Sequence, residues 1–175
     1  MNSHYMLVFA CLWELAQSHP STGNLAATIR ATQSSIANYL GYAGNAIDGN
    51  NNTDYSMGSC SRTANEESPW WRVDMFYRYQ VKRVRITTSS DGPGLTGAEI
   101  RIGENINNSP LCANIESLPA GQAAEFTCER GKVPGRYLTI IVPDYKTNLT
   151  LCEVEVFGFH DPLEAEDGHS SLISD

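Results

Sequence analysis

The chain has 175 residues, 41% of them hydrophobic, and a formal net charge of −8 at pH 7. This length provides one well-buried core and is short for two. Without Glu14 and the five acids of residues 160–175, a segment with no Lys or Arg, fourteen acids face twelve bases. The near-neutral central region argues against a nucleic-acid surface, and no apolar run reaches the roughly eighteen residues of a membrane span.

Residues 1–18 are expected to be a secretory signal peptide. Residues 6–13, MLVFACLW, form an apolar run, and the small residues that follow favour cleavage between Ser18 and His19. Two features depart from the usual pattern, because no Lys or Arg precedes the run and Glu14 interrupts it. An atypical leader, or part of a mis-spliced first exon, is therefore the alternative.

Residues 45–52, NAIDGNNN, predict a tight loop, because Asp, Asn and Gly favour turns and tolerate left-handed backbone conformations. Calcium is bound by about six to eight oxygen ligands. Asp48, Asn50, Ser59 and the turn carbonyls would supply several of them. The alternative is an Asx-rich surface turn without a metal ion.

Short runs of alternating apolar and polar residues predict half-buried strands throughout the rest of the chain. Together with the intervening Gly, Pro, Asn and Ser clusters, they predict an all-β, single-domain β-sandwich of the jelly-roll kind over residues 19–159. Residues 31–44 are expected to be a loop with about one helical turn, and residues 160–175 an acidic, disordered tail. The predicted strands lie at 71–75, 83–87, 98–102, 126–128, 136–142 and 152–156.

Cysteine usage favours export. Cys11 would leave with the leader, and the four remaining cysteines allow three pairings. The short segment between Cys112 and Cys128 can return as a hairpin, which favours that pair and leaves Cys60 with Cys152. A zinc site is disfavoured, because the four cysteines form no Cys-x-x-Cys pair and have no nearby His.

An ordered series of sequence blocks runs from residue 24 to residue 158. The blocks are NLA at 24–26, ATQSS at 31–35, NAIDGN at 45–50, GSC at 58–60, PWWRVD at 69–74, GAEIRIG at 97–103, GRY at 135–137 and LCEVEVFG at 151–158. This series resembles the F-type lectins, or fucolectins. The resemblance implies a secreted, discoidin-like jelly roll that binds L-fucose on loops at one end, with a structural calcium ion nearby.

The resemblance also implies a calcium site and a disulfide pairing. It implies the pairs Cys60–Cys152 and Cys112–Cys128, which is the pairing that the spacing favours. The implied calcium ligands are Asn45, Asp48, Asn50, Ser59, the carbonyl of Cys152 and the carboxylate of Glu153.

The fucose motif of the family is degenerate in this chain. Arg62 stands at the position of the family's histidine, Ser89 replaces its first arginine, and Asp91 is retained. The second basic residue has no counterpart, and Gly92-Pro93 replaces a pair of adjacent cysteines in a shorter loop. Each lost charge-assisted donor is worth roughly 1.5–3 kcal/mol, whereas millimolar binding amounts to only about 4 kcal/mol in total.

Two classes of function follow from these features. The first is a calcium-stabilised lectin that binds fucose weakly or binds other glycans, with Arg62 able to meet sialylated or sulfated sugars; the resemblance also implies a homo-oligomer. The second is a discoidin-like adhesion or protein-interaction module without lectin activity. An enzyme is not expected, because His4, His19, His160 and His169 are placed outside the predicted fold, which leaves no histidine for a catalytic constellation.

Overall fold

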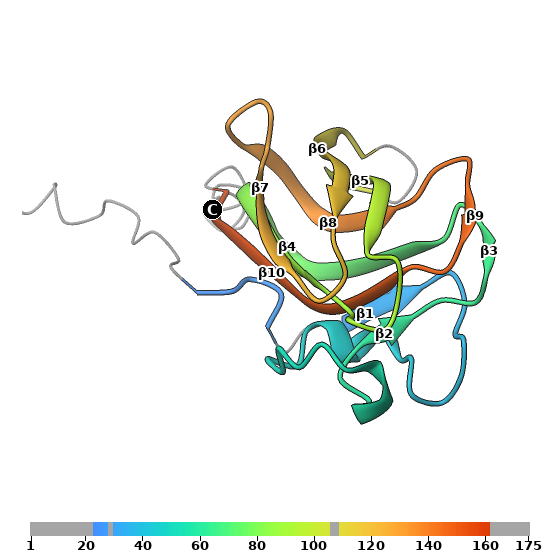
Figure 1. Cartoon of the computed structure of the whole chain (residues 1–175). Coiled ribbons are helices and arrows are strands. Elements are labelled where there is room, and N and C mark those ends of the chain that lie inside the picture. Colours follow the sequence, from blue (N-terminus) through green and yellow to red (C-terminus); the bar gives the residue numbers. More distant parts are fainter. Residues whose placement is uncertain (1–22, 28–29, 106–108, 162–175) are drawn as a thin grey trace, which may run out of the picture.

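The computed structural model describes residues 23–27, 30–105 and 109–161. Its regular structure is almost entirely antiparallel β-strand, arranged as a β-sandwich (Figure 1), as predicted. The elements are β1 (Arg30–Gln33), η2 (Ala43–Ala46), η3 (Tyr55–Met57), β2 (Ser61–Arg62), β3 (Glu66–Glu67), β4 (Trp70–Thr88), β5 (Leu95–Gly103), β6 (Leu111–Leu118), β7 (Ala123–Thr127), β8 (Val133–Ile141), β9 (Lys146–Thr147) and β10 (Thr150–His160). None of the helices in these residues is long and apolar enough to cross a membrane.

The long strand β4 joins the two layers of the sandwich. Its first half pairs with β1 and β8. β8 also pairs with residues 79–81 of β4 and continues through β5 to β6. Its second half pairs with β7 and with β10, which lies beside β4 in Figure 1 and also pairs with β2. The predicted strands at 71–75 and 83–87 are therefore two parts of one strand.

A bulge between Asp74 and Tyr79 lets β4 bend from one layer to the other. Phe76 adopts a left-handed φ of 62° there, and its backbone N–H donates to Asp74 Oδ1 at 2.9 Å. Arg136 on β8 holds the same carboxylate through two hydrogen bonds, of 2.6 and 2.7 Å. The alternating pattern is interrupted at the bulge, and this is why the sequence suggested separate strands.

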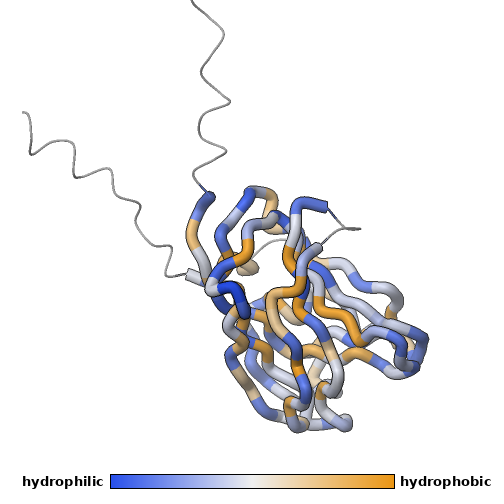
Figure 2. The backbone as a smooth tube through the Cα atoms, turned by 90° about the horizontal axis from the view of Figure 1, so that it is seen from above, coloured by the Kyte–Doolittle hydropathy of each residue, from blue (hydrophilic) through white to orange (hydrophobic). Residues whose placement is uncertain are grey.

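The core lies between the layers and follows the predicted alternation. Trp71, Val73 and Met75 are at most 1% exposed, whereas Trp70 is only half-buried. The Trp71 indole N–H donates to the carbonyl of Ala43 at 3.0 Å, which fixes η2 against the sheet. Figure 2 shows apolar and polar residues alternating along the strands.

The predicted hairpin between Cys112 and Cys128 is wrong, although the disulfide is present. β6 pairs with β5, whereas β7 pairs with the second half of β4, so the segment crosses between layers. Thr88 on β4 donates its hydroxyl to Pro119 at 2.7 Å and its N–H to Gln122 at 2.9 Å. These bonds attach the connecting turn to β4, which favours pairing of β7 with β4 over pairing with β6.

Two boundaries differ from those expected. Residues 31–44 contain most of β1 as well as the start of the short helix η2. At the other end, β10 includes His160, whose ring lies 5.2 Å from that of Tyr79, and Asp161 is only 1% exposed. The ordered domain therefore extends past residue 159, and His160 belongs to the fold. The expected signal peptide and residues 162–175 of the tail lie outside the described residues.

Candidate functional site

The loop that follows η2 is shaped by its own side chains. In four successive Asx turns, a side-chain oxygen accepts a hydrogen bond from the backbone N–H two residues later. The donor–acceptor distances are 2.8 Å at Asp48, 3.1 Å at Asn50, 3.0 Å at Asn52 and 2.9 Å at Asp54. The predicted tight loop is confirmed, and it lies with η2 and η3 at the lower edge of Figure 1.

The Cys60–Cys152 disulfide attaches this loop to β10. It joins residues 92 positions apart, and both cysteines are fully buried in a small cluster with Tyr55. Because Cys152 precedes Glu153, the bridge holds the loop close to that acidic side chain. The two disulfides of the structure have the pairing that the sequence favoured.

Glu153 and Asp48 line one cavity of about 350 Å³, together with Gly49. Glu153 is only 2% exposed, and its Oε2 accepts a hydrogen bond from the Gly49 N–H at 3.2 Å. Burial raises the pKa of Glu153 to about 7, against the opposing effect of the Gly49 bond, and the nearby negative charge of Asp48 raises it further. A cation between the two carboxylates would relieve both unfavourable effects.

The side chains of the other expected calcium ligands make hydrogen bonds within the protein. The Asn45 amide donates to the Leu40 carbonyl at 2.7 Å, and the Asn50 side chain is engaged in its Asx turn. The Ser59 hydroxyl donates to the Asp54 carbonyl at 2.9 Å. Within the described residues no group of three or more His, Cys, Asp or Glu side chains forms a metal cluster. Besides the Asp48 and Glu153 carboxylates, the expected ligand set is therefore made of amide, hydroxyl and backbone oxygens.

Cys152 lies at an irregularity in the strand pairing. The register between β10 and β4 shifts between Leu151 and Glu153, so Cys152 has no assigned partner residue on β4. A β-bulge of this kind interrupts the ladder of backbone hydrogen bonds. The bulge suits the expected use of the Cys152 carbonyl as a ligand.

The three sugar-site positions, altered Arg62 and Ser89 and retained Asp91, are brought together beside η3. The Asp91 N–H donates to Ser89 Oγ at 3.1 Å, and an Arg62 N–H donates to the Asp91 carbonyl at 3.4 Å. The Asp91 carboxylate accepts the backbone N–H of Tyr55 at 2.8 Å. The sequence thus identified residues that share one place in the fold.

These side chains are largely occupied by contacts within the protein. The Arg62 guanidinium lies 3.5 Å from the centroid of the Tyr55 ring, and its Nε donates to Thr150 Oγ1 at 3.0 Å. The Ser89 hydroxyl donates to the Thr53 carbonyl at 3.1 Å. Two N–H groups of Arg62 and the Ser89 hydroxyl are therefore directed at neighbouring protein groups.

Comparison with known proteins places the chain in a family. The family model of the NedA-like, galactose-binding domain matches residues 45–140. Fucolectin-5 of Anguilla japonica is 43% identical over 144 residues, which cover 76% of this chain and 75% of that protein. The chain belongs to the F-type lectin family.

Solved structures agree with this assignment. The F-type lectin from striped bass (Morone saxatilis) serum superposes with a TM-score of 0.76 at 43% identity, covering 81% of this chain. The present chain spans half the length of that protein. The lectin domain of lectinolysin, solved in complex with Lewis B antigen, has a TM-score of 0.70 at 30% identity, covering 78% of this chain and 96% of that domain. These relatives are lectins rather than enzymes, as expected for this chain.

Sequence reasoning missed two residues of this F-type lectin that organise the altered site. Tyr55 provides both the ring below Arg62 and the N–H that holds Asp91. Thr53 provides the carbonyl that accepts from Ser89. A tyrosine followed by Ser, Met and Gly in a loop otherwise rich in Asn and Asp was a detectable signal for Tyr55. No sequence signal singles out the Thr53 backbone carbonyl.

Proposed function

We propose that this F-type lectin is a secreted, calcium-stabilised carbohydrate-binding protein in which the fucose contacts are largely replaced. It would bind fucosylated glycans weakly or have an altered glycan specificity. The observation that supports the proposal is the set of contacts of Arg62, which donates to the Asp91 carbonyl and is stacked on Tyr55. The relatives support the sugar-binding class, since one is named a fucolectin and another was solved with Lewis B antigen.

The loss of donors supports weak or altered binding. A neutral sugar is recognised by hydrogen bonds aimed at its hydroxyl groups, and each charge-assisted bond contributes about 1.5–3 kcal/mol. Ser89 provides a hydroxyl where the family resemblance implies an arginine, and that hydroxyl is already used by Thr53. Asp91 can still accept hydrogen bonds, but one of its carboxylate oxygens is held by Tyr55.

Neutral glycans are favoured over acidic ones at this position. A bidentate contact with a carboxylate or sulfate needs two N–H groups of one guanidinium edge. Arg62 directs Nε to Thr150 and another N–H to the Asp91 carbonyl, and the Asp91 carboxylate lies nearby. Sialylated and sulfated sugars would therefore meet a cation with two N–H groups already engaged and a repelling anion.

Calcium is proposed as the structural cation. The Asp48 and Glu153 carboxylates share a cavity in which a divalent cation would neutralise both. Carbonyl oxygens of Asn45, Asn50 and Cys152 would extend the oxygen shell. The Ser59 hydroxyl keeps lone pairs for a cation while it donates its proton to Asp54.

Secretion and self-association complete the proposal. Two disulfides in a domain of this size are typical of proteins from oxidising compartments, which agrees with the expected leader at residues 1–18. Association into a homo-oligomer would raise the strength of weak single-site binding through multivalency. An adhesion or protein-interaction module without lectin activity remains the second candidate, because the same replacement of fucose contacts is expected for it.

A glycan array read with calcium and again with EDTA tests the proposal. We expect weak binding to fucosylated or other neutral glycans, lost when EDTA removes the cation, and little binding to sialylated or sulfated glycans. The variant Asp48→Ala should resemble the EDTA-treated protein. Absence of binding to every glycan by folded, calcium-loaded protein would contradict the lectin proposal and favour the interaction module.

A further inference from the structure

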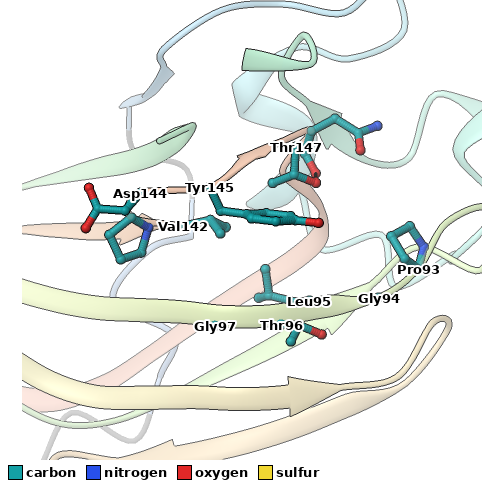
Figure 3. A pocket seen from close by; sticks show the side chains of 11 residues that line it. Pro93, Gly94, Leu95, Thr96, Gly97, Val142, Asp144, Tyr145 and Thr147 are labelled. Carbon is teal, nitrogen blue, oxygen red and sulfur yellow. Dashed lines mark hydrogen bonds between the residues drawn. The ribbon is translucent and has the colours of Figure 1, made fainter. Parts of the chain in front are cut away.

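A groove of about 610 Å³ lies beside the altered fucose position (Figure 3). Its two walls are the start of β5 and the segment that connects β8 to β9 and β10. Pro93, Gly94 and Asn148 line this groove and also a smaller cavity that contains Ser89 and Asp91. The two spaces therefore adjoin, and the groove has a volume typical of small-ligand sites.

An exposed aromatic ring forms the main apolar surface of the groove. Tyr145 is 64% exposed, and Figure 3 shows its ring extending over Leu95. Leu95 and Val142 are each only 3% exposed and provide an apolar base. An exposed, amphipathic ring over an apolar base is suited to stacking against the apolar face of a pyranose ring.

The position of Tyr145 is fixed by its neighbours. The Ser68 N–H donates to the Tyr145 carbonyl at 3.1 Å, and the Asp144 N–H donates to Ser68 Oγ at 3.0 Å. Beyond the tyrosine, β9 pairs with β3 through Lys146 and Thr147. This arrangement holds the loop in place before a ligand arrives and so reduces the entropy lost on binding.

Polar groups around the ring have no partner within the part of the chain that the structure describes. The Tyr145 hydroxyl, the Asn148 amide and the Thr96 hydroxyl make no hydrogen bond or ion pair there. The lining contains one acid, Asp144, and no Lys or Arg. These side chains can donate hydrogen bonds to sugar hydroxyl groups and accept hydrogen bonds from them. The Asp144 carboxylate, with no Lys or Arg in the lining, disfavours an anionic ligand.

We propose that this groove is a second sugar subsite that binds a neutral pyranose next to the altered fucose position. This inference rests on the proposed carbohydrate-binding function and names where a further sugar residue would be held. Tyr145 would stack on the ring, while Asn148, Thr96 and Asp144 would bind its hydroxyl groups. Contacts in the groove could then replace part of the binding that the altered fucose position no longer provides to a glycan.

Asn148 begins an Asn-Leu-Thr glycosylation sequon, and an attached glycan would itself enter the groove. The test therefore uses disulfide-bonded, calcium-loaded protein made in a host without N-glycosylation. Backbone amide shifts are followed by NMR during separate titrations with D-galactose, N-acetyl-D-glucosamine, L-fucose and N-acetylneuraminic acid. Amides at Thr96, Gly97 and Tyr145 report the groove, whereas those at Ser89 and Asp91 report the altered fucose position.

We expect at least one neutral sugar to shift the groove amides, and N-acetylneuraminic acid to leave them unchanged. Tyr145→Ala should weaken that binding by about tenfold, the effect of losing one aromatic contact. Tyr77→Ala is the matched control, because Tyr77 is similarly exposed at 59% but lies on the β4 bulge. The Tyr77→Ala variant should bind the neutral sugar with the same affinity as the unaltered protein.

Three results would overturn the inference: no groove shift with any neutral sugar, equal shifts with the acidic sugar, or unchanged affinity in Tyr145→Ala. The same experiment distinguishes failure of the groove proposal from failure of the proposed lectin function. Shifts confined to Ser89 and Asp91 would support the lectin proposal and reject the groove. Shifts confined to the groove would support the second subsite and show that the altered fucose position is not used.

Discussion

Glu153 shows how one residue couples burial to cation binding. Its carboxyl group is almost completely buried beside Asp48, and among the described residues it accepts one hydrogen bond, from the Gly49 N–H. Such a group is stable when it is protonated or when a cation neutralises it. Which of the two applies depends on pH and on calcium, and both can be controlled in solution.

The first prediction concerns the stability of the calcium-free protein as a function of pH. The pKa of Glu153 is raised from 4.5 to about 7 in the folded state, so the folded protein binds more protons than the unfolded chain between these values. The associated stability is complete below pH 4.5 and is lost as the pH rises through about 7. We expect the melting temperature in EDTA to fall from pH 5 to pH 8, by an amount equivalent to about 2 kcal/mol.

Calcium should remove this dependence, since the cation stabilises the ionised carboxylate. Glu153→Gln is the matched control, because it keeps the side-chain volume and does not titrate. In EDTA, the Glu153→Gln variant should not show the decrease in stability that ionisation of Glu153 causes between pH 5 and pH 8. It should also gain little stability from calcium. A calcium-free protein whose melting temperature is the same at pH 5 and pH 8 would show that Glu153 is not the coupled group.

At the scale of elements, the β4 bulge explains how one strand serves two layers. Phe76 is held at a φ of 62°, although it is 57% exposed. A left-handed conformation costs a non-glycine residue about 1–2 kcal/mol, and glycine avoids this cost at the expense of some chain entropy. The bulge is therefore a position where glycine, which has no Cβ atom, should improve stability.

The second prediction is that Phe76→Gly raises the free energy of unfolding by about 0.5–1 kcal/mol. Tyr77→Gly is the control, because Tyr77 is similarly exposed and is not among the residues with positive φ. It should lower the free energy of unfolding by a similar amount. Denaturant unfolding of both variants measures the difference, and a loss of stability in Phe76→Gly would contradict the left-handed bulge.

The third prediction separates the roles of the two disulfides. In the loop-entropy model, removal of Cys112–Cys128 costs about 3 kcal/mol and removal of Cys60–Cys152 about 4–5 kcal/mol. Because Cys152 adjoins Glu153, only the second bridge connects the Asx-rich loop to the cation cavity. Pairs of Cys→Ala substitutions should therefore differ in their response to calcium as well as in stability.

Thermal unfolding with and without calcium measures this difference. The variant that lacks Cys112 and Cys128 should keep the calcium-dependent rise in melting temperature. The variant that lacks Cys60 and Cys152 should lose most of it. If both variants respond to calcium like the unaltered protein, then the bridge does not organise the cation site.

For the whole molecule, the sequence predicted the fold class and segments of β4, β5, β7, β8 and β10, because period-two alternation depends on local burial, but it did not identify β1 or β6. Alternation placed Trp71, Val73 and Met75 in the core. It could not show that residues 70–88 form one strand, since the bulge depends on contacts between Asp74 and Arg136 on another strand. The return of β7 to β4 likewise depends on tertiary bonds made by Thr88.

The candidate site was predictable to the extent that residue types specify chemistry. The Asx-rich loop, the altered residues Arg62 and Ser89, and the retained Asp91 could be named in advance. Their present partners could not, because stacking on Tyr55 and bonding to the Thr53 carbonyl require the folded geometry. The groove around Tyr145 was also beyond sequence reasoning, since its walls come from distant segments.

Isothermal titration calorimetry with free L-fucose tests the central claim most directly. The sample is the disulfide-bonded protein with calcium, and the similar fucose binding module of Streptococcus pneumoniae serves as the positive control. Because Arg62 and Ser89 are directed at protein groups, we predict a dissociation constant weaker than about 1 mM, which corresponds to less than about 4 kcal/mol of binding free energy. A dissociation constant in the micromolar range or tighter would contradict the account and show that the fucose site is intact in another form.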